Sequence, residues 1–65
     1  MSFGTQLRLA RKRKKMTQMA LAQAIGAKHN SVSNWESDRN RPDPETIRQL
    51  CEVLEVTPKE LFDFR

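Results

Sequence analysis

The sequence predicts an all-α fold, a compact bundle of five short helices in a single domain that spans residues 1–65. Apolar residues recur at helical spacing, and no run of residues alternates with the period of two that is typical of a half-buried strand. Pro44 and Pro58 each stand directly after a capping residue, where a helix begins. A chain of 65 residues with one cysteine has no disulfide framework, so helix packing must stabilise it.

The first helix is expected over residues 4–14, because Phe3, Leu7 and Ala10 fall on one face. Its end carries a run of four cations, residues 12–15. Positive charge at the end of a helix complements the helix dipole, and the same charge can contact phosphate. Both interpretations of the run are compatible with the sequence.

Residues 17–36 organise the chain, because they predict two short helices joined by a tight turn. The hydroxyl of Thr17 can cap a helix whose apolar face includes Leu21 and Ala22. Gly26 ends that helix, since glycine adopts a positive φ without a Cβ penalty.

A third helix is expected over about residues 28–36, with Val32 and Trp35 buried. Its opposite face gathers short polar side chains at positions i, i+1, i+4 and i+5, namely His29, Asn30, Ser33 and Asn34. Asn, Ser and His form helices less readily than the Glu, Lys or Gln of an ordinary exposed face. The polar face is therefore interpreted as a hydrogen-bonding surface.

The third helix is followed by a predicted loop, in which Pro42 prevents the helix from continuing. Asp38 is expected to adopt the left-handed conformation that usually favours glycine. Arg39, Asn40 and Arg41 are expected to be exposed, either for solubility or as contacts for an anionic partner.

Two further helices complete the predicted bundle. The fourth begins at Pro44 after the cap Asp43, and its apolar stripe comprises Ile47, Leu50, Cys51 and Leu54. The fifth opens with the capping box Thr57-Pro58-Lys59-Glu60 and carries Leu61, Phe62 and Phe64. Three apolar side chains in four residues exceed one core stripe. Phe62 and Phe64 therefore either lie partly exposed or fold back onto the core.

Charge is distributed unevenly along the chain, whose formal net charge is +4. Residues 1–41 contain nine Lys or Arg and two acidic residues, a balance of +7, whereas residues 42–65 contain three and six, a balance of −3. Basic charge around the polar third helix favours a polyanionic partner, since phosphate contacts supply most non-specific affinity for nucleic acid. The alternative is a basic surface that serves only solubility.

The segment of residues 17–36 resembles the helix-turn-helix of phage repressor and Cro proteins, the XRE-like transcriptional regulators. The matching residues are Thr17-Gln18, Leu21-Ala22, Gly26, Ser31-Val32-Ser33 and Trp35-Glu36. Flanking residues also stand where that family places them, which extends the resemblance over nearly the whole chain. Lys15 departs from the family's usual glycine, so the first helix is expected to end in a strained turn or to run longer. Ala20 replaces the family's usual glutamate, which weakens the start of the second helix.

The resemblance implies a lambda-repressor-like five-helix fold and a sequence-specific transcriptional regulator, in particular a repressor. Such a protein binds double-stranded DNA as a homodimer on a two-fold operator, with the third helix in the major groove. Base contacts are assigned to His29, Asn30, Ser33 and Asn34, and phosphate contacts to Gln18, Lys28, Ser31, Arg39, Asn40 and Arg41. Arg11 and Glu36 are expected to form a structural pair, and Phe62 and Phe64 to contact the second protomer.

A protein-interaction or antitoxin-like module of the same fold, which docks a partner through Phe62 and Phe64, is the alternative. No nucleophile and base, carboxylate pair or glycine-rich phosphate loop indicates an enzyme, and no cofactor or small-molecule substrate is expected. His29 lacks partners at metal-ligand spacing, so no metal site is expected either. The chain has no apolar run long enough to span a bilayer and no signal-peptide core, which predicts a cytoplasmic protein.

Overall fold

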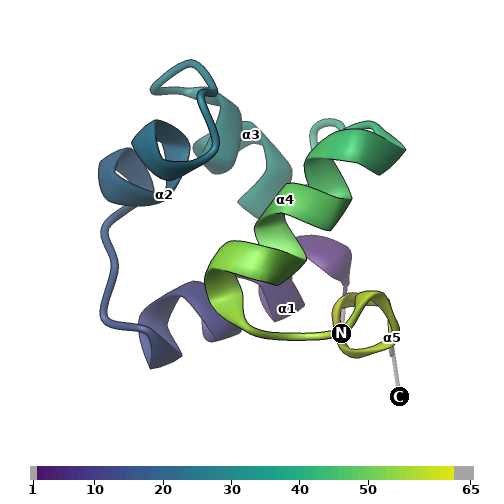
Figure 1. Ribbon diagram of the computed structural model, residues 1–65. Helices are drawn as coiled ribbons and strands as arrows, with labels where there is room; N and C mark the ends of the chain where they lie inside the picture. Colours follow the sequence, from purple (N-terminus) through teal and green to yellow (C-terminus); the bar gives the residue numbers. More distant parts are fainter. Residues whose placement is uncertain (1, 63–65) are drawn as a thin grey trace.

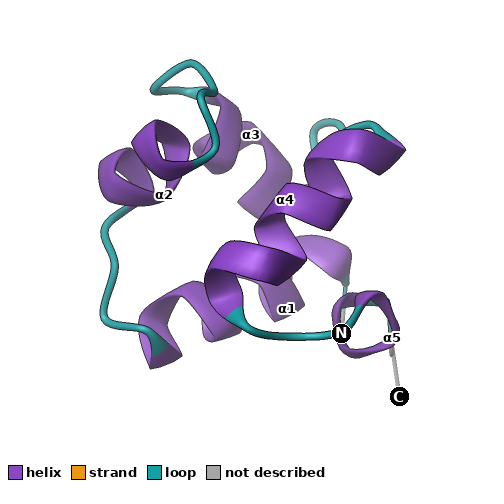
Figure 2. Cartoon of the chain, viewed as in Figure 1, coloured by secondary structure: helices purple, strands orange, loops and turns teal. Residues whose placement is uncertain are grey.

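The structure, a computed structural model, describes residues 2–62 and contains five helices and no strand in that range (Figure 1). The helices are α1 (Phe3–Arg13), α2 (Gln18–Ala24), α3 (Ser31–Glu36), α4 (Pro44–Leu54) and α5 (Pro58–Leu61). Loops and turns make up the rest of the described chain (Figure 2). The all-α, five-helix fold predicted from the sequence is confirmed.

One apolar core lies between the helices. α3 packs against both α1 and α2, while α5 packs against α1 and α4. In Figure 1, α1 runs along the bottom of the view, α2 lies on the left, and α4 crosses the front. The buried apolar side chains are Phe3, Leu7, Ala10, Leu21, Ala22, Ile25, Val32, Trp35, Leu50, Cys51, Leu54 and Leu61. Every helix therefore turns an apolar face to the same core.

Four of the five described helices begin with a side-chain cap. Side-chain oxygens of Ser2, Thr17, Asp43 and Thr57 each accept a hydrogen bond from the backbone N–H three residues further on. Such a bond satisfies one of the N–H groups that the first turn of a helix leaves without a partner. The predicted caps at Thr17, Asp43 and Thr57 are confirmed.

Left-handed residues end four helices, at Lys15, Gly26, Asp38 and Glu55. After each of them, the next N–H donates to the carbonyl five residues earlier, at 2.8–3.2 Å. Gly26 adopts this conformation freely, whereas a residue with a Cβ is strained by it. The left-handed conformation predicted for Asp38 is confirmed, and α1 ends in a strained turn at Lys15 rather than running longer.

The third helix begins later than predicted, at Ser31 rather than near residue 28. Lys28, His29 and Asn30 form a turn instead, in which Ser31 N–H donates to Lys28 O at 3.0 Å. The predicted start was wrong because no side chain caps the helix before Ser31, and His and Asn form helices poorly.

α1 crosses α3 at Gly4, where no side chain would fit. A Cβ on Gly4 would lie 2.4 Å from the carbonyl oxygen of Glu36 and 2.7 Å from that of Trp35. The N–H of Gly4 donates to the Asp38 carboxylate at 2.9 Å, which ties the start of α1 to the end of α3. Hydrogen bonds from the Ser2 hydroxyl and from this N–H hold the pKa of Asp38 below its ordinary value.

Candidate nucleic-acid interface

The outer face of α3 carries two of the residues predicted to contact bases. Ser33 is exposed and Asn34 is half-buried, whereas Val32 and Trp35 pack into the core on the opposite side. Packing against α1 and α2 fixes the helix in place and leaves its polar side accessible. Hydroxyl and amide groups on such a face can hydrogen-bond to base edges.

The remaining candidates for base contact lie in the turn before α3. His29 and Asn30 are exposed there, together with the phosphate candidate Lys28. The backbone carbonyl of Asn30 accepts from Asn34 N–H at 3.1 Å, so these two residues stay one helical turn apart. Ser31, a phosphate candidate, is partly buried at the first position of α3. Lys28, His29 and Asn30 therefore lie beside the start of α3 but outside the helix itself.

Glu36, at the end of α3, is the centre of a polar cluster with Arg8, Arg11 and Gln18, termed the Glu36 cluster. Arg11 donates to Glu36 from Nε to Oε2 at 2.6 Å and from Nη2 to Oε1 at 3.1 Å. Gln18 Nε2 donates to Oε1 at 3.0 Å, and Arg8 Nε lies 3.5 Å from the same oxygen. The structure therefore brings Arg11 and Glu36 together and adds two further residues to them.

The carboxyl side chain of Glu36 is only 1% exposed. Burial alone would raise the pKa of Glu36, but hydrogen bonds from Arg11 and Gln18 and the charges of Arg11 and Arg8 outweigh burial and hold that pKa below its ordinary value. Arg11 also donates from Nη1 to Met16 O at 2.8 Å. An ionised carboxylate thus joins α1, α2 and α3.

Sequence reasoning missed Arg8 and the contact between Gln18 and Glu36. A signal for Arg8 was present, because it lies three residues before Arg11 and so shares a face of α1 with it. No local signal connects Gln18 with Glu36. Their contact depends on how α2 and α3 pack.

The loop after α3 carries three phosphate candidates. Arg39 and Asn40 are exposed. The guanidinium carbon of Arg41, which is also exposed, lies 5.6 Å from the ring centroid of Phe3 and 5.4 Å from that of Phe62. Contacts of this kind stabilise a cation over an aromatic face. Arg41 therefore holds its loop against two aromatic rings, a role that the sequence did not predict.

Phe62 is half-buried and packs on Phe3 of the same chain, with ring centroids 5.1 Å apart. This contact joins the start of α1 to α5, which lie side by side in Figure 1. Phe62 thus folds back onto the core of its own chain, which is the second of the two arrangements that the sequence left open. Phe64, the other predicted dimer contact, lies outside the described residues.

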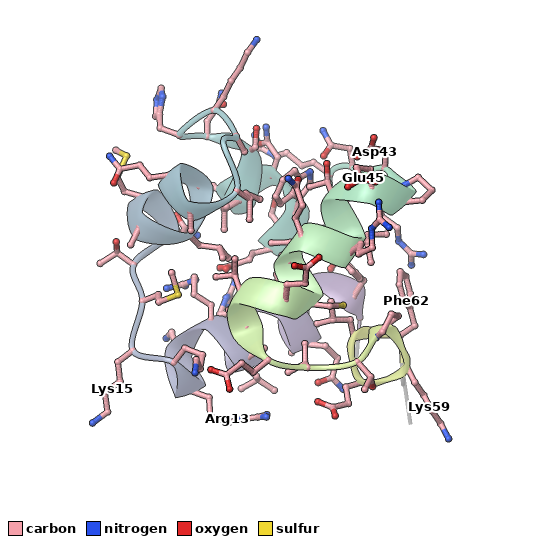
Figure 3. All side chains as sticks on the ribbon, viewed as in Figure 1. Arg13, Lys15, Asp43, Glu45, Lys59 and Phe62 are labelled. Carbon is pink, nitrogen blue, oxygen red and sulfur yellow. The ribbon has the colours of Figure 1, made fainter. Side chains whose placement is uncertain are left out.

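The cationic run of residues 12–15 lies at and just beyond the end of α1. Figure 3 shows Arg13 and Lys15 extending away from the end of α1 at the bottom of the view, whereas Asp43 and Glu45 lie at the start of α4 at the upper right. Lys14, in the same cationic run, forms an ion pair with Glu55. Lys14 is thus paired within the domain, although all four side chains of the run are exposed.

Other kinds of site find little support in residues 2–62. Within that range, no group of His, Cys, Asp or Glu side chains is placed to hold a metal ion, and no pocket is present. Cys51 is buried, and burial raises the pKa of its thiol. None of the described helices is long and apolar enough to cross a membrane. The polar side of α3 and the cations around it are the strongest candidate for a functional surface.

A family model described as a helix-turn-helix domain matches residues 2–63. The chain belongs to the helix-turn-helix family. In this helix-turn-helix protein, α2 and α3 are the two helices of the motif, and residues 25–30 connect them.

Curated relatives of the helix-turn-helix protein are regulators. It is 36% identical over 58 residues to the HTH-type transcriptional regulator DicA of Escherichia coli. This match covers 89% of the chain and 43% of that relative. It is 31% identical over 60 residues to the repressor protein C2 of Salmonella phage P22. That match covers 92% of the chain and 28% of that relative. The chain thus spans less than half the length of these two relatives. The family is one of non-enzymatic regulators, in agreement with the expectation that the domain is not an enzyme.

Solved structures of the same family superimpose closely on the helix-turn-helix protein. The P22 c2 repressor in complex with a synthetic operator matches with a TM-score of 0.92 and 28% identity, over 100% of this chain and 98% of that chain. The restriction-modification controller protein C.AhdI from Aeromonas hydrophila matches with a TM-score of 0.85 and 32% identity, over 92% of this chain and 91% of that chain. These matches confirm the predicted repressor-like fold.

Proposed function

We propose that this chain is the DNA-binding domain of a transcriptional regulator of repressor type that recognises a specific sequence in double-stranded DNA. The observation that carries the proposal is the polar outer face of α3, held clear of the core on a scaffold that superimposes on an operator-bound repressor with a TM-score of 0.92. The regulators from Escherichia coli and phage P22 support the same class of function. These relatives come from a bacterium and a bacterial phage, and bacterial DNA lies in the cytoplasm, so a cytoplasmic location belongs to the proposal.

Base recognition is proposed for α3 and the turn before it, inserted into the major groove. The amides of Asn30 and Asn34 can each bond bidentately to adenine, and one good pair is worth ~1–3 kcal/mol of discrimination. His29 can donate to an acceptor on guanine or thymine, and Ser33 can bond to several bases. The turn that holds His29 and Asn30 directly precedes the first residue of α3, which supports this role because the N-terminal part of a recognition helix is the part that meets base edges.

Phosphate contacts are proposed for polar and basic residues that flank α3, namely Gln18, Lys28, Ser31, Arg39, Asn40 and Arg41. These contacts would set the register of the domain on the duplex and supply most of its non-specific affinity. The excess of basic residues in the first 41 positions supports the assignment, with its balance of +7.

A homodimer on two half-sites is part of the proposal. A single α3 spans too few base pairs to select one site from a genome, whereas two copies on half-sites about one helical turn apart would suffice. Phe62 and Phe64 are the candidate contacts between protomers, and the half-buried ring of Phe62 keeps an accessible part.

Selection of bound sequences from a random duplex pool, followed by binding isotherms, tests this function. The selected duplex should bind more tightly than a random duplex, and affinity for both should fall steeply as salt rises. The selected sequence should contain two related halves. A chain that binds no duplex, or that binds without salt dependence, would contradict the proposal and favour a protein-docking module of the same fold.

A further inference from the structure

Arg8 is a basic residue of α1 that the proposed interface does not yet use. Its side chain is 50% exposed, and Nε lies 3.5 Å from Glu36 Oε1. Among the residues that the structure describes, Glu36 is its one ion-pair partner. Arg8 therefore forms the outer, solvent-exposed edge of the Glu36 cluster.

The charges in this cluster do not balance. Glu36 carries one negative charge, and Arg11 already neutralises it through two hydrogen bonds of 2.6 and 3.1 Å. Arg8 approaches the same carboxylate at the longer distance of 3.5 Å and from a half-exposed position. Two guanidinium groups thus face one carboxylate, and the surplus positive charge lies on Arg8, next to solvent.

Arg8 and Gln18 lie side by side at this edge. Arg8 Nε and Gln18 Nε2 approach the same oxygen atom, Glu36 Oε1, at 3.5 and 3.0 Å. The second hydrogen of the Gln18 amide and the outer nitrogens of the Arg8 guanidinium are further donors. Donors from a charged and a neutral side chain that meet at one point suit an anionic oxygen.

We propose that Arg8 and Gln18 together bind one backbone phosphate of the duplex, and that Glu36 is the positioning residue that holds both side chains. The proposal rests on the proposed function, because it adds α1 to the interface of the same DNA-binding domain. It also explains how Gln18 can serve a phosphate while one of its amide hydrogens is bonded to Glu36. The carboxylate orients the amide, and the charge that attracts the phosphate comes from Arg8.

Arg8→Gln tests the proposal, with Arg48→Gln as the matched control. Both substitutions remove one positive charge from an exposed arginine that is paired with a glutamate, but Arg48 lies on α4 and pairs with Glu45. Affinity for a selected and a random duplex is measured at several salt concentrations. Arg8→Gln should weaken binding to both duplexes on the order of tenfold and flatten the slope of log affinity against log salt by ~0.9. Arg48→Gln should leave that slope unchanged.

Two further variants sharpen the test. Arg8→Lys keeps the charge and should restore most of the slope. In the double variant Arg8→Gln/Gln18→Ala, the loss of affinity should be smaller than the product of the two single losses, because both side chains serve one phosphate. Thermal unfolding of each variant shows whether the domain remains folded at the temperature of the binding measurement.

The outcomes separate this proposal from the function on which it rests. If the wild-type chain binds duplex DNA with the expected salt dependence but Arg8→Gln has the same slope as wild type or as Arg48→Gln, the phosphate contact of Arg8 is overturned and the function stands. If the two single losses multiply in the double variant, Arg8 and Gln18 do not share a phosphate. If the wild-type chain binds no duplex, the function itself fails.

Discussion

The side chain of Glu36 carries a charge inside the core of a 65-residue domain. A buried carboxylate is tolerated when it is paired and its oxygens are hydrogen-bonded. Arg11 and Gln18 meet that requirement with hydrogen bonds to both oxygens. Because Arg11 lies on α1 and Gln18 on α2, the same carboxylate fixes how the first three helices pack.

Replacing Glu36 with Gln is expected to lower the free energy of unfolding by ~3 kcal/mol, because Arg11 is left as a buried cation without a counter-ion. Urea unfolding at neutral pH measures the difference from wild type. Glu45→Gln is the control, since it removes a carboxylate from an exposed pair with Arg48 and should change stability by ~0.5 kcal/mol or less. Equal urea midpoints for Glu36→Gln and wild type would show that the pair is not structural.

The pH dependence of stability reports on the same carboxylate. Burial opposes ionisation, but the bonds from Arg11 and Gln18 hold the pKa of Glu36 below its ordinary value of 4.5. An acid with a lowered pKa in the folded state contributes stability above its ordinary pKa, and that contribution is lost as pH falls through the folded value. Wild type should therefore lose stability more steeply than Glu36→Gln below about pH 4.5. Parallel curves from urea unfolding at each pH would contradict this account.

Relief of backbone strain at Lys15 is expected to stabilise the domain, in contrast to the destabilising substitution of Glu36. Lys15 has a φ of 58°, and a side chain costs ~1–2 kcal/mol in that conformation. Lys15→Gly is expected to raise the free energy of unfolding by ~0.5–1 kcal/mol, after the greater chain entropy of glycine is subtracted. Lys12→Gly removes the same charge from the interior of α1 and should lower it by ~1 kcal/mol. Thermal unfolding compares the two, and a lower melting temperature for both would rule out strain at Lys15.

At the scale of the elements, the crossing of α1 and α3 depends on Gly4. Gly4→Ala is expected to lower the free energy of unfolding by ~2 kcal/mol or more, because the new Cβ would meet backbone atoms of Glu36 and Trp35. At an ordinary helix position the same change stabilises by up to ~1 kcal/mol, so the sign of the effect is diagnostic. Leu9→Ala, at an exposed site on α1, should change stability by ~0.5 kcal/mol or less. Chemical unfolding of a Gly4→Ala variant that proved more stable than wild type would disprove the close crossing.

Helix starts were predictable where the signal is local. α4 and α5 begin where the sequence predicted, because a cap and a proline stand next to one another in Asp43-Pro44 and Thr57-Pro58. The start of α3 was misplaced because no capping side chain marks it.

Contacts between elements were less predictable than the elements themselves. The polar face of α3 follows from helical spacing, which is a property of neighbouring residues. The contact of Gln18 with Glu36 and the close approach of Gly4 to α3 depend on packing between segments that lie far apart in sequence. The stacking of Arg41 on Phe3 and Phe62 joins three such segments, and nothing in the local sequence indicates it.

At the scale of the whole molecule, the proposed interface draws on α1, α2, α3 and the loop after α3. The Glu36 cluster joins the first three of these elements, and the Arg41 contacts with Phe3 and Phe62 hold the loop. A domain that presents its contacts in this way pays little ordering cost when it binds. In the proposed interface, specific and non-specific contacts come from different residues, so substitutions can separate them.

The affinities of Asn34→Ala and Arg41→Ala for the selected and the random duplex test base recognition by α3 most directly. Asn34→Ala should cost ~1–3 kcal/mol on the selected duplex and little on the random one, because random sequence rarely satisfies a base contact. Arg41→Ala should weaken both duplexes nearly equally and flatten the slope of log affinity against log salt by ~1. An Asn34→Ala variant that binds the selected duplex as tightly as wild type, beside an Arg41→Ala variant that no longer distinguishes the two duplexes, would contradict recognition by α3.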